Sequence, residues 1–408
     1  MCKIVVSFVF LDTNRTSCFI MEKKVKHKSA QDRVVLINQS TGYLMVDIVN
    51  AYAEKYSDVV LLTGNLDTLE RTLDKSVKVH KIATYIRTSF FMRTLTWLIA
   101  TLQIFFLLLW KYRHYRIVYV TNPPMSYFPS LILKRKYSVV VYDVYPDALN
   151  NIGIHEGSLI YKAWAKINKW IYRNADRVYT LSEGMATLLL AYCGRDKILV
   201  IPNWMGMGSL PRIEKMENPF ILKHDLLHKF VVMYSGNIGF THNVASIIEI
   251  AETFREDDDI VFLIIGEGLK KAELMLWVKE KGLENCSFLS WQPSEELKYS
   301  LSAADVSIIT LTDETALVSV PSKTYNLLAV GSPLLCIAPE ESELARLVEE
   351  HGCGKCFTKE KVIEMSHFVR ELKANHNLWK SYSDSSLKAS LSYTYRNCLL
   401  YTSPSPRD

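Results

Sequence analysis

The residues best suited to chemistry lie in three short loops in the second half of the chain. Residues 231–239 read VVMYSGNIG, an apolar strand that runs directly into a loop containing Gly236, Asn237 and Gly239. Glycine lets a backbone turn sharply and approach a ligand, so the amides of such a loop can bind phosphate. Residues 243–254 carry apolar residues at helical spacing, which directs a positive helix N-terminus toward the loop. The pattern predicts an anion site, with a strand-to-helix turn that binds nothing as the alternative.

Two further loops carry groups that suit a sugar diphosphate. Gly266-Glu267-Gly268 follows the apolar run FLII, so the backbone can approach a ligand while the Glu267 carboxylate accepts hydrogen bonds from sugar hydroxyls. Pro321-Ser322-Lys323 opens a predicted helix at 323–329, where proline suits the first turn and Lys323 supplies positive charge. A plain turn and a solvated lysine are the simpler interpretations of these two loops.

Two motifs that resemble metal sites are interpreted as structural. The acidic run at 256–259 precedes a strand rather than following one, which is typical of a solvated loop. Cys353 and Cys356 form a single Cys-x-x-Cys beside one histidine, without a second pair, and we interpret them as a turn. The eight cysteines, without a credible secretion signal, indicate reduced cytosolic thiols. We therefore expect no metal and no cofactor.

Chain length and charge limit the number of domains and the kinds of partner to be expected. A chain of 408 residues exceeds the usual size of one core, so two domains are expected. Residues 1–217 contain 29 Lys and Arg against 17 Asp and Glu, a net charge of +12, whereas residues 218–408 contain 19 against 26, a net charge of −7. The first half is expected to face something anionic, such as a membrane surface or lipid phosphate. No motif for RNA or DNA binding accompanies this charge, so no nucleic-acid partner is expected.

Short apolar runs alternate with helical segments and predict an α/β protein with two facing Rossmann-like, doubly wound parallel-sheet domains. The first domain is placed at 33–205, with strands near 34–39, 59–63, 117–121, 139–142, 176–181 and 197–201. Residues 206–219 carry Gly, Pro and alternating charge, which is typical of a linker. The second domain is placed at 220–385, with strands near 231–234, 261–265, 286–291, 305–310 and 333–338.

Residues 90–116 begin with the most hydrophobic segment of the chain and end with four basic residues. The uncharged part, residues 95–110, is shorter than the roughly 20 residues of a membrane-spanning helix. A buried crossover helix and a helix lying in the membrane interface remain the two alternatives. The basic charge of the first half favours membrane contact through Phe90 to Arg116.

These motifs together resemble glycosyltransferase family 4, in the branch of bacterial N-acetyl-amino-sugar and surface-polysaccharide transferases. The resemblance covers about residues 35–397 and rests on YSGNIG, FLIIGEG and PSKTYNLLAVGSPLLC, with LSEGM and IPNW in the first half. It implies a GT-B fold of two Rossmann-like domains, a nucleotide-sugar held mainly by the second domain, and an acceptor at the first. It also implies transfer that retains anomeric configuration without a metal.

The resemblance carries roles onto residues whose positions match the family motifs. Gly236 and Gly239, with Asn237 between them, fall in the diphosphate loop, and Gly266 and Glu267 fall in a loop near the donor. Ser322 and Lys323 meet donor phosphate and sugar, and Asn326 meets the ribose. Asp143 matches a catalytic aspartate of the family, and Tyr142 stands before it where many members have histidine. Asn203 matches a hinge asparagine.

The sequence departs from the family at two places. The Glu pair that many members carry around this helix is replaced by Val318 and Asn326. The Arg and Lys that follow the glycine loop elsewhere are replaced by Thr241-His242-Asn243. Lys323 and His242 are the local cations that remain, and we expect Asp143 and Lys323 to be the catalytic residues.

The ends of the chain are interpreted separately. Either Met1 or Met21 is the start of the protein, since the residues before Arg33 show no clear pattern. Residues 386–397 match the start of the helix that returns to the first domain in family members. Residues 398–408, CLLYTSPSPRD, resemble a translated sequencing adapter and are interpreted as an artefact.

The function predicted from sequence is transfer of an N-acetylated or deoxy sugar from a UDP-linked donor to a polyprenyl-diphosphate-linked or glycan acceptor. The product would belong to a surface polysaccharide such as an O-antigen or capsule, and the enzyme would lie at the cytoplasmic face of the cell membrane. A nucleotide-sugar epimerase of the same fold and a non-catalytic binding scaffold are the alternatives. The sequence leaves the donor sugar, nucleotide, acceptor, linkage and oligomeric state open.

Overall fold

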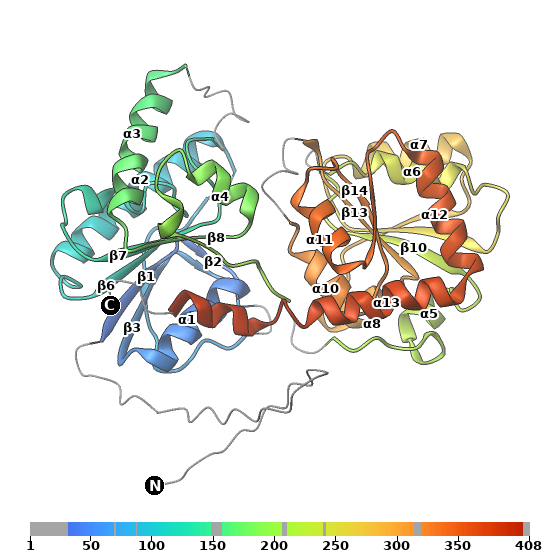
Figure 1. Ribbon diagram of the computed structural model, residues 1–408, viewed down its shortest axis with the longest axis horizontal. Coiled ribbons are helices and arrows are strands. Elements are labelled where there is room, and N and C mark those ends of the chain that lie inside the picture. The colour runs from blue at the N-terminus through green and yellow to red at the C-terminus, as the bar shows by residue number, and fades with distance from the viewer. Residues whose placement is uncertain are drawn as a thin grey trace, which may run out of the picture.

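The computed structural model describes residues 32–68, 71–86, 88–147, 157–205, 210–239, 242–313 and 320–402. These residues form two α/β domains that lie side by side (Figure 1). Each domain is built on a parallel sheet covered by helices on both faces, as the sequence predicts.

The first domain contains a seven-stranded parallel sheet in the order β5-β3-β1-β6-β7-β8-β9. Its pairing places Val34 of β1 beside Val59 of β3 and Arg116 of β6, so the central strands are buried on both faces. A two-stranded pair, β2 with β4, lies next to it. The strands are β1 Arg33–Ile37, β2 Ser40–Thr41, β3 Asp58–Thr63, β4 Asn65–Leu66, β5 Lys78–Lys81, β6 Arg116–Val120, β7 Tyr137–Val141, β8 Arg177–Thr180 and β9 Ile198–Val200.

Helices cover this sheet because alternate strand residues point to opposite faces. Val35, Ile37 and their neighbours pack against α2, α3 and α4 on one face. Val34 and Leu36 pack against α1 on the other face. The helices are α1 Tyr43–Lys55, α2 Phe90–Leu109, η1 Phe128–Leu131, α3 Leu159–Asn174, α4 Glu183–Leu189 and η3 Arg195–Lys197.

The second domain contains a six-stranded parallel sheet in the order β12-β11-β10-β13-β14-β15. The strands are β10 Phe230–Ser235, β11 Ile260–Ile265, β12 Cys286–Leu289, β13 Val306–Thr310, β14 Leu334–Ile337 and β15 Gly354–Phe357. The helices are η4 Lys215–Glu217, α5 Pro219–Lys223, α6 Ala245–Glu252, α7 Lys271–Lys281, η5 Ser294–Glu296, α8 Leu297–Ser302, α10 Lys323–Ala329, α11 Glu343–His351, α12 Val362–Ala374 and α13 His376–Ser390. The hydrophobic residues of β10 therefore lie at the centre of the sheet, with cores on both sides.

Two edge strands and one motif differ from the sequence analysis. The strands β5 and β15 were not predicted, because each is short and only partly buried at the edge of a sheet. The interpretation of the Cys-x-x-Cys motif as a turn was wrong for its second half. Cys353 lies in the turn after α11, but Cys356 lies within β15.

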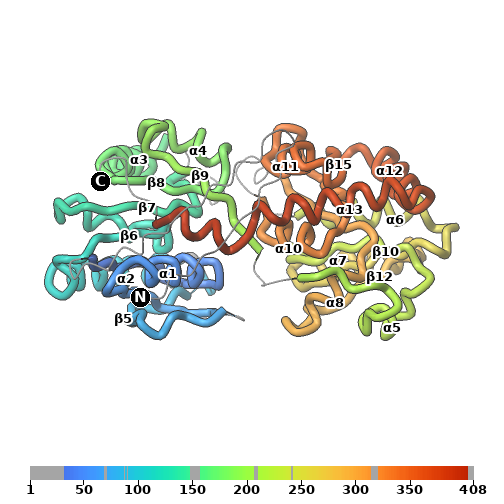
Figure 2. The backbone as a smooth tube through the Cα atoms, turned by 60° about the horizontal axis from the view of Figure 1, so that its bottom comes forward, coloured from blue at the N-terminus to red at the C-terminus, as the bar shows by residue number. Residues whose placement is uncertain are grey.

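The C-terminal segment crosses from the second domain back to the first. After α13 the chain forms η6, Tyr395–Thr402, which packs on α1 (Figure 2). Tyr52 and Tyr179 each donate a hydroxyl hydrogen bond to the Tyr401 carbonyl, at 2.8 and 3.0 Å. Residues 398–402, part of the segment interpreted as an artefact, thus lie against the first domain, whereas 403–408 lie outside the described residues.

The hydrophobic helix α2 is only partly covered. Its inner face, with Ala100, Ile104 and Leu108, packs against the sheet. By length and composition alone α2 could cross a membrane, and only 28% of its most apolar window is buried. One face of α2 thus covers the sheet, as a crossover helix does, while the other face is exposed.

Candidate functional site

The carboxyl ends of the two sheets face each other across the domain boundary. Burial raises the pKa of the Tyr43 hydroxyl, which follows β2, and the Ser322 side chain, which follows β13, partly offsets this rise. The Gly184 amide, after β8, donates to the Glu343 carboxylate, after β14. In parallel sheets the loops at these ends are the usual place for ligands. The loops selected from the sequence therefore lie on the side of the second domain that faces the first.

Two glycine loops of the second domain meet backbone to backbone. Gly266 has a φ of +153°, and a Cβ atom there would lie 1.9 Å from the carbonyl oxygen of Gly236. At Gly268, with a φ of +158°, a Cβ would lie 2.2 Å from the Ile238 carbonyl oxygen. Only glycine fits such an approach. The two loops therefore act as one unit at the ends of β10 and β11.

This contact changes the expected use of the first loop. The Gly236 amide donates to the Ile265 carbonyl at 2.9 Å, and the Ile238 amide donates to the Glu267 carbonyl at 2.9 Å. Both amides are used to join the loops, so these two amides are not available to phosphate. Asn237 and Gly239 carry the other amides of the described loop.

Lys323 brings a positive group to this loop. Its Nζ atom is buried, lacks a hydrogen-bond partner among the described residues, and would lie 2.6 Å from a Cβ on Gly236. Burial lowers the pKa of Lys323 to about 7, with a small opposing effect of Cys336. A buried amine without a partner is costly, so an anion placed here would be bound and would restore the charge. Lys323 is the strongest functional candidate in the second domain.

Tyr234 positions Lys323, and sequence reasoning missed this residue. The Lys323 Nζ lies 3.8 Å from the centre of the Tyr234 ring, a cation–π arrangement. The Tyr234 hydroxyl donates to the Asn237 carbonyl at 2.8 Å, which fixes the loop. Its place directly before Ser235-Gly236 in the YSGNIG motif was the available signal, but the motif suggests only a buried strand residue.

The remaining predicted donor residues lie around the same loops. Glu267 forms an ion pair with Lys271 at 2.7 Å, and hydrogen bonds from Lys271 and Ser290 lower the pKa of its carboxyl. Ser322 is exposed next to Lys323, and Asn326 is half-buried on α10. The carbonyl of His242 accepts from the Val244 amide at 3.0 Å before α6. Val318 lies outside the described residues.

Asp143 lies at the end of β7 in the first domain. The Thr121 hydroxyl accepts hydrogen bonds from the Tyr142 and Asp143 amides at 3.0 and 3.3 Å, which fixes the turn. The Asp143 side chain remains accessible to water, but the protein around it limits hydration and raises the pKa of its carboxyl. Thr121 is a second residue that sequence reasoning missed.

The first-domain motifs LSEGM and IPNW have structural roles at the boundary. Ser182 caps α4 by accepting from the Met185 amide, and Gly184 makes the contact with Glu343. In IPNW the buried Trp204 donates its indole N–H to Asp47 at 2.8 Å. Asn203, matched to the family hinge, has a buried Oδ1 atom without a hydrogen-bond partner in the described part of the chain.

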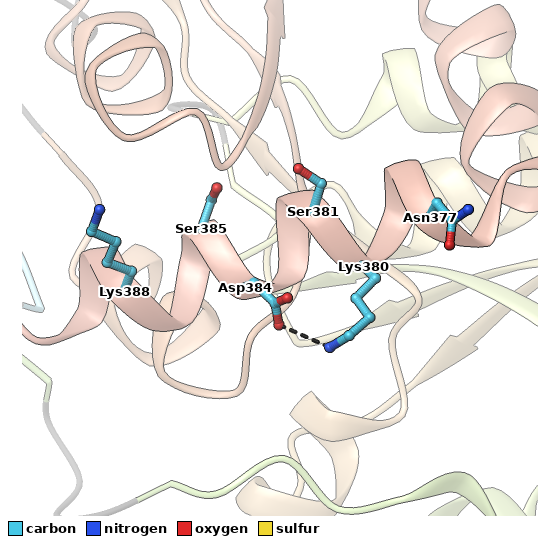
Figure 3. Close-up of a pocket in the computed structure, with 6 residues that line it drawn as sticks. All are labelled: Asn377, Lys380, Ser381, Asp384, Ser385 and Lys388. Carbon is cyan, nitrogen blue, oxygen red and sulfur yellow. Dashed lines mark hydrogen bonds and ion pairs between the residues drawn. The ribbon is translucent and has the colours of Figure 1, made fainter.

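Other parts of the described structure offer no comparable site. No group of three or more His, Cys, Asp and Glu side chains that could hold a metal occurs among the described residues. A hollow along α13 is shown in Figure 3. All of its lining residues come from this one helix, and Lys380 is already paired with Asp384 at 3.1 Å. Groups on a single helix do not converge on a ligand, so we place no site there.

Comparison with known families agrees with the two-domain arrangement. Residues 43–204 match the family model described as Glycosyl transferase 4-like domain, and residues 219–388 match that described as Glycosyl transferases group 1. The chain belongs to these glycosyltransferases. The boundaries of both matches fall close to the two sheets described above, and the resemblance identified from the sequence is confirmed.

Two bacterial proteins are similar in sequence to part of this glycosyltransferase. It is 28% identical over 244 residues to a probable glycosyltransferase, WbjE, of Pseudomonas aeruginosa, covering 57% of this chain and 60% of the relative. It is 26% identical over 249 residues to WcaI of Escherichia coli K12, a putative colanic acid biosynthesis glycosyl transferase. This match covers 58% of this chain and 60% of WcaI. The matches thus span less than two thirds of each relative.

Solved structures confirm the GT-B fold of this glycosyltransferase. Anabaena Alr3699/HepE, solved in complex with UDP, superimposes with a TM-score of 0.70 at 12% identity, over 91% of this chain and 98% of that one. WaaG, a glycosyltransferase involved in lipopolysaccharide biosynthesis, superimposes with a TM-score of 0.67 at 12% identity, over 90% of this chain and 98% of WaaG. At this identity the similarity shows the fold alone.

Proposed function

We propose that this protein is a retaining glycosyltransferase of surface-polysaccharide biosynthesis, such as that of an O-antigen or capsule. The donor is a nucleotide-sugar, with UDP as nucleotide and an N-acetylated or deoxy sugar. The acceptor is a glycan or a lipid-linked sugar at the cytoplasmic face of the membrane. The family membership, the relative WcaI and the UDP bound in the solved HepE complex support this proposal.

The observation that carries the proposal is the buried Lys323 amine against the glycine loop. A diphosphate beside Gly236 would give this amine the anionic partner that it lacks among the described residues. As the sugar leaves, negative charge builds on the diphosphate. A cation already held in place stabilises that charge more strongly than it stabilises the intact donor, which is how it speeds the reaction.

Asp143 has the complementary role in the first domain. It lies on the acceptor side, fixed by Thr121, and its raised carboxyl pKa suits exchange of a proton with an acceptor hydroxyl. In the proposed reaction the hydroxyl oxygen bonds to the anomeric carbon on the face from which the diphosphate leaves. The diphosphate keeps the electrons of the broken bond, and the hydroxyl proton is lost through Asp143.

Calorimetry and product analysis test this function. Purified protein is titrated with UDP and GDP, and then incubated with UDP-sugars with and without membrane extract as a source of acceptor. We expect UDP binding, acceptor-dependent release of UDP, and a product with the anomeric configuration of the donor by NMR. Isomerised donor without acceptor would instead identify an epimerase, and absence of nucleotide binding would leave only a scaffold.

The exposed face of α2 supports peripheral attachment to the membrane. Leu95, Leu98, Leu102, Phe106 and Leu109 recur at helical spacing and are exposed, with Leu102 at 59%. Lys111 and Arg113 follow this stripe and are exposed, so they can reach anionic headgroups. Arg116 of the predicted basic cluster instead pairs with Asp176 at 3.3 Å.

Vesicle sedimentation tests the attachment. We expect the protein to bind vesicles that contain anionic phosphatidylglycerol more strongly than pure phosphatidylcholine vesicles, and the L102E variant to lose most of this binding. The matched control is L276E, since Leu276 is an exposed apolar residue of α7 in the other domain. Equal binding by L102E and the wild type would contradict the attachment through α2.

A further inference from the structure

A cluster of aromatic side chains and one arginine lies beside Asp143 in the first domain. It is not part of the donor loops of the second domain. Tyr145 follows Asp143 by two residues, and the charges of both Asp143 and Arg93 act on its hydroxyl. The Gln39 side chain, which follows β1, donates a hydrogen bond to the Thr96 carbonyl at 3.0 Å and so holds the start of α2 at the end of β1. The cluster therefore belongs to the carboxyl edge of the first sheet.

The rings form a continuous row. Tyr85 stacks on Trp97, with centroids 6.0 Å apart and planes at 17°. Trp97 meets Tyr145 edge to face at 6.4 Å, and Tyr145 stacks on Trp164 at 5.9 Å. The guanidinium of Arg93 lies 5.3 Å from the Trp97 ring. Because Tyr85, Arg93 and Tyr145 are only partly buried, the row has an accessible side.

The indole N–H groups of Trp97 and Trp164 in this row have no hydrogen-bond acceptor among the described residues. Trp97 is only 6% exposed, and its indole N–H has no hydrogen-bond acceptor among the described residues. Buried donors are normally satisfied, and leaving one unsatisfied is unfavourable. An oxygen atom of a bound molecule would supply the acceptor.

We propose that Tyr85, Arg93, Trp97 and Tyr145 form an acceptor subsite for a sugar that is attached to its carrier through a phosphate. This inference rests on the proposed transferase function, whose acceptor it specifies. The aromatic faces bind the apolar C–H face of a sugar ring, and the Trp97 N–H donates to a sugar oxygen. The Arg93 guanidinium binds the phosphate, for which its planar geometry is suited. The net charge of +12 on residues 1–217 favours an anionic acceptor of this kind.

The test uses N-acetylglucosamine 1-phosphate as the probe, with N-acetylglucosamine as its uncharged counterpart. Both are titrated into the full chain and followed by saturation-transfer NMR, with saturating UDP present so that the probe cannot occupy the donor site. We expect the 1-phosphate to bind at least tenfold more tightly than the free sugar. W97F keeps the stacked ring but removes the N–H, and R93Q removes the charge; each should weaken binding of the 1-phosphate at least tenfold.

The controls separate this subsite from the donor site. W291F alters an exposed tryptophan of the second domain and should leave probe affinity unchanged. UDP affinity should be the same in W97F, R93Q and the wild type, and thermal unfolding of each variant checks that it folds. If UDP binds but the 1-phosphate does not, or if both variants bind it like the wild type, the subsite is refuted while the transferase function stands. If UDP itself does not bind, the transferase function falls.

Discussion

Replacement of Lys323 by methionine should affect activity and stability in opposite directions. Methionine keeps the length of the side chain but removes the amine that lies beside Gly236. A charge-assisted hydrogen bond contributes about 1.5 to 3 kcal/mol, so losing it at the leaving diphosphate should lower kcat about 10- to 150-fold. The assay is release of UDP from a UDP-sugar under saturating donor.

The stability of K323M should differ from that of the wild type in a pH-dependent way. Burial lowers the pKa of Lys323 from 10.5 to about 7 in the folded protein. Between these values the unfolded chain binds a proton that the folded chain does not, so wild-type stability rises with pH across this window. Below pH 7 both states are protonated and the wild type carries the full cost, at most about 5 kcal/mol at 1.36 kcal/mol per pKa unit. K323M should therefore be more stable than the wild type at pH 6, and this gain should shrink toward pH 10.

Proton uptake gives a third measurement for the same residue. Because a bound diphosphate favours the charged amine, UDP binding at pH 8 should take up close to one proton in the wild type and none in K323M. Calorimetry in two buffers of different ionisation enthalpy measures this number. The control is K380M, since Lys380 is an exposed lysine on α13 (Figure 3). Full activity of K323M, or UDP binding without proton uptake by the wild type, would refute the reasoning.

Three further changes test other parts of the site. D143N should lower kcat at least 100-fold with UDP affinity unchanged, because Asp143 lies on the acceptor side; an unchanged kcat would exclude it as the catalytic acid–base group. Y234L should lower both UDP affinity and kcat, since it removes the ring below Lys323 and the bond to the Asn237 carbonyl, whereas Y234F, which keeps the ring, should retain most of the kcat. Equal activity of Y234L and the wild type would show that the ring does not position Lys323. G266A should destabilise the protein by about 1 to 3 kcal/mol in chemical denaturation, because its Cβ would lie 1.9 Å from the Gly236 carbonyl oxygen; unchanged stability would mean that the two loops can separate at no cost.

The sequence by itself determined the central strands of both sheets, the start of α10 and the division into two α/β domains. Apolar runs such as VVMYS are bounded by turn residues, and this pattern is local, so β10 and α10 are found where they were predicted. The position of Lys323 at the start of α10 was equally local. Edge strands such as β15 carry a weaker pattern because they are only partly buried, and the sequence analysis missed them.

Only the tertiary structure decided how the site is arranged. That Gly236 and Ile238 use their amides to bind the second glycine loop depends on the pairing of β10 with β11, which brings together residues about thirty positions apart. The contact of Lys323 with the Tyr234 ring joins residues from separate strand ends, and the Gly184 amide donates to the Glu343 carboxylate across the two domains. A sequence pattern records which face of an element is apolar, but it does not record which distant element covers that face. The lowered pKa of Lys323, its unpartnered amine and the aromatic row beside Asp143 all result from contacts between such distant elements.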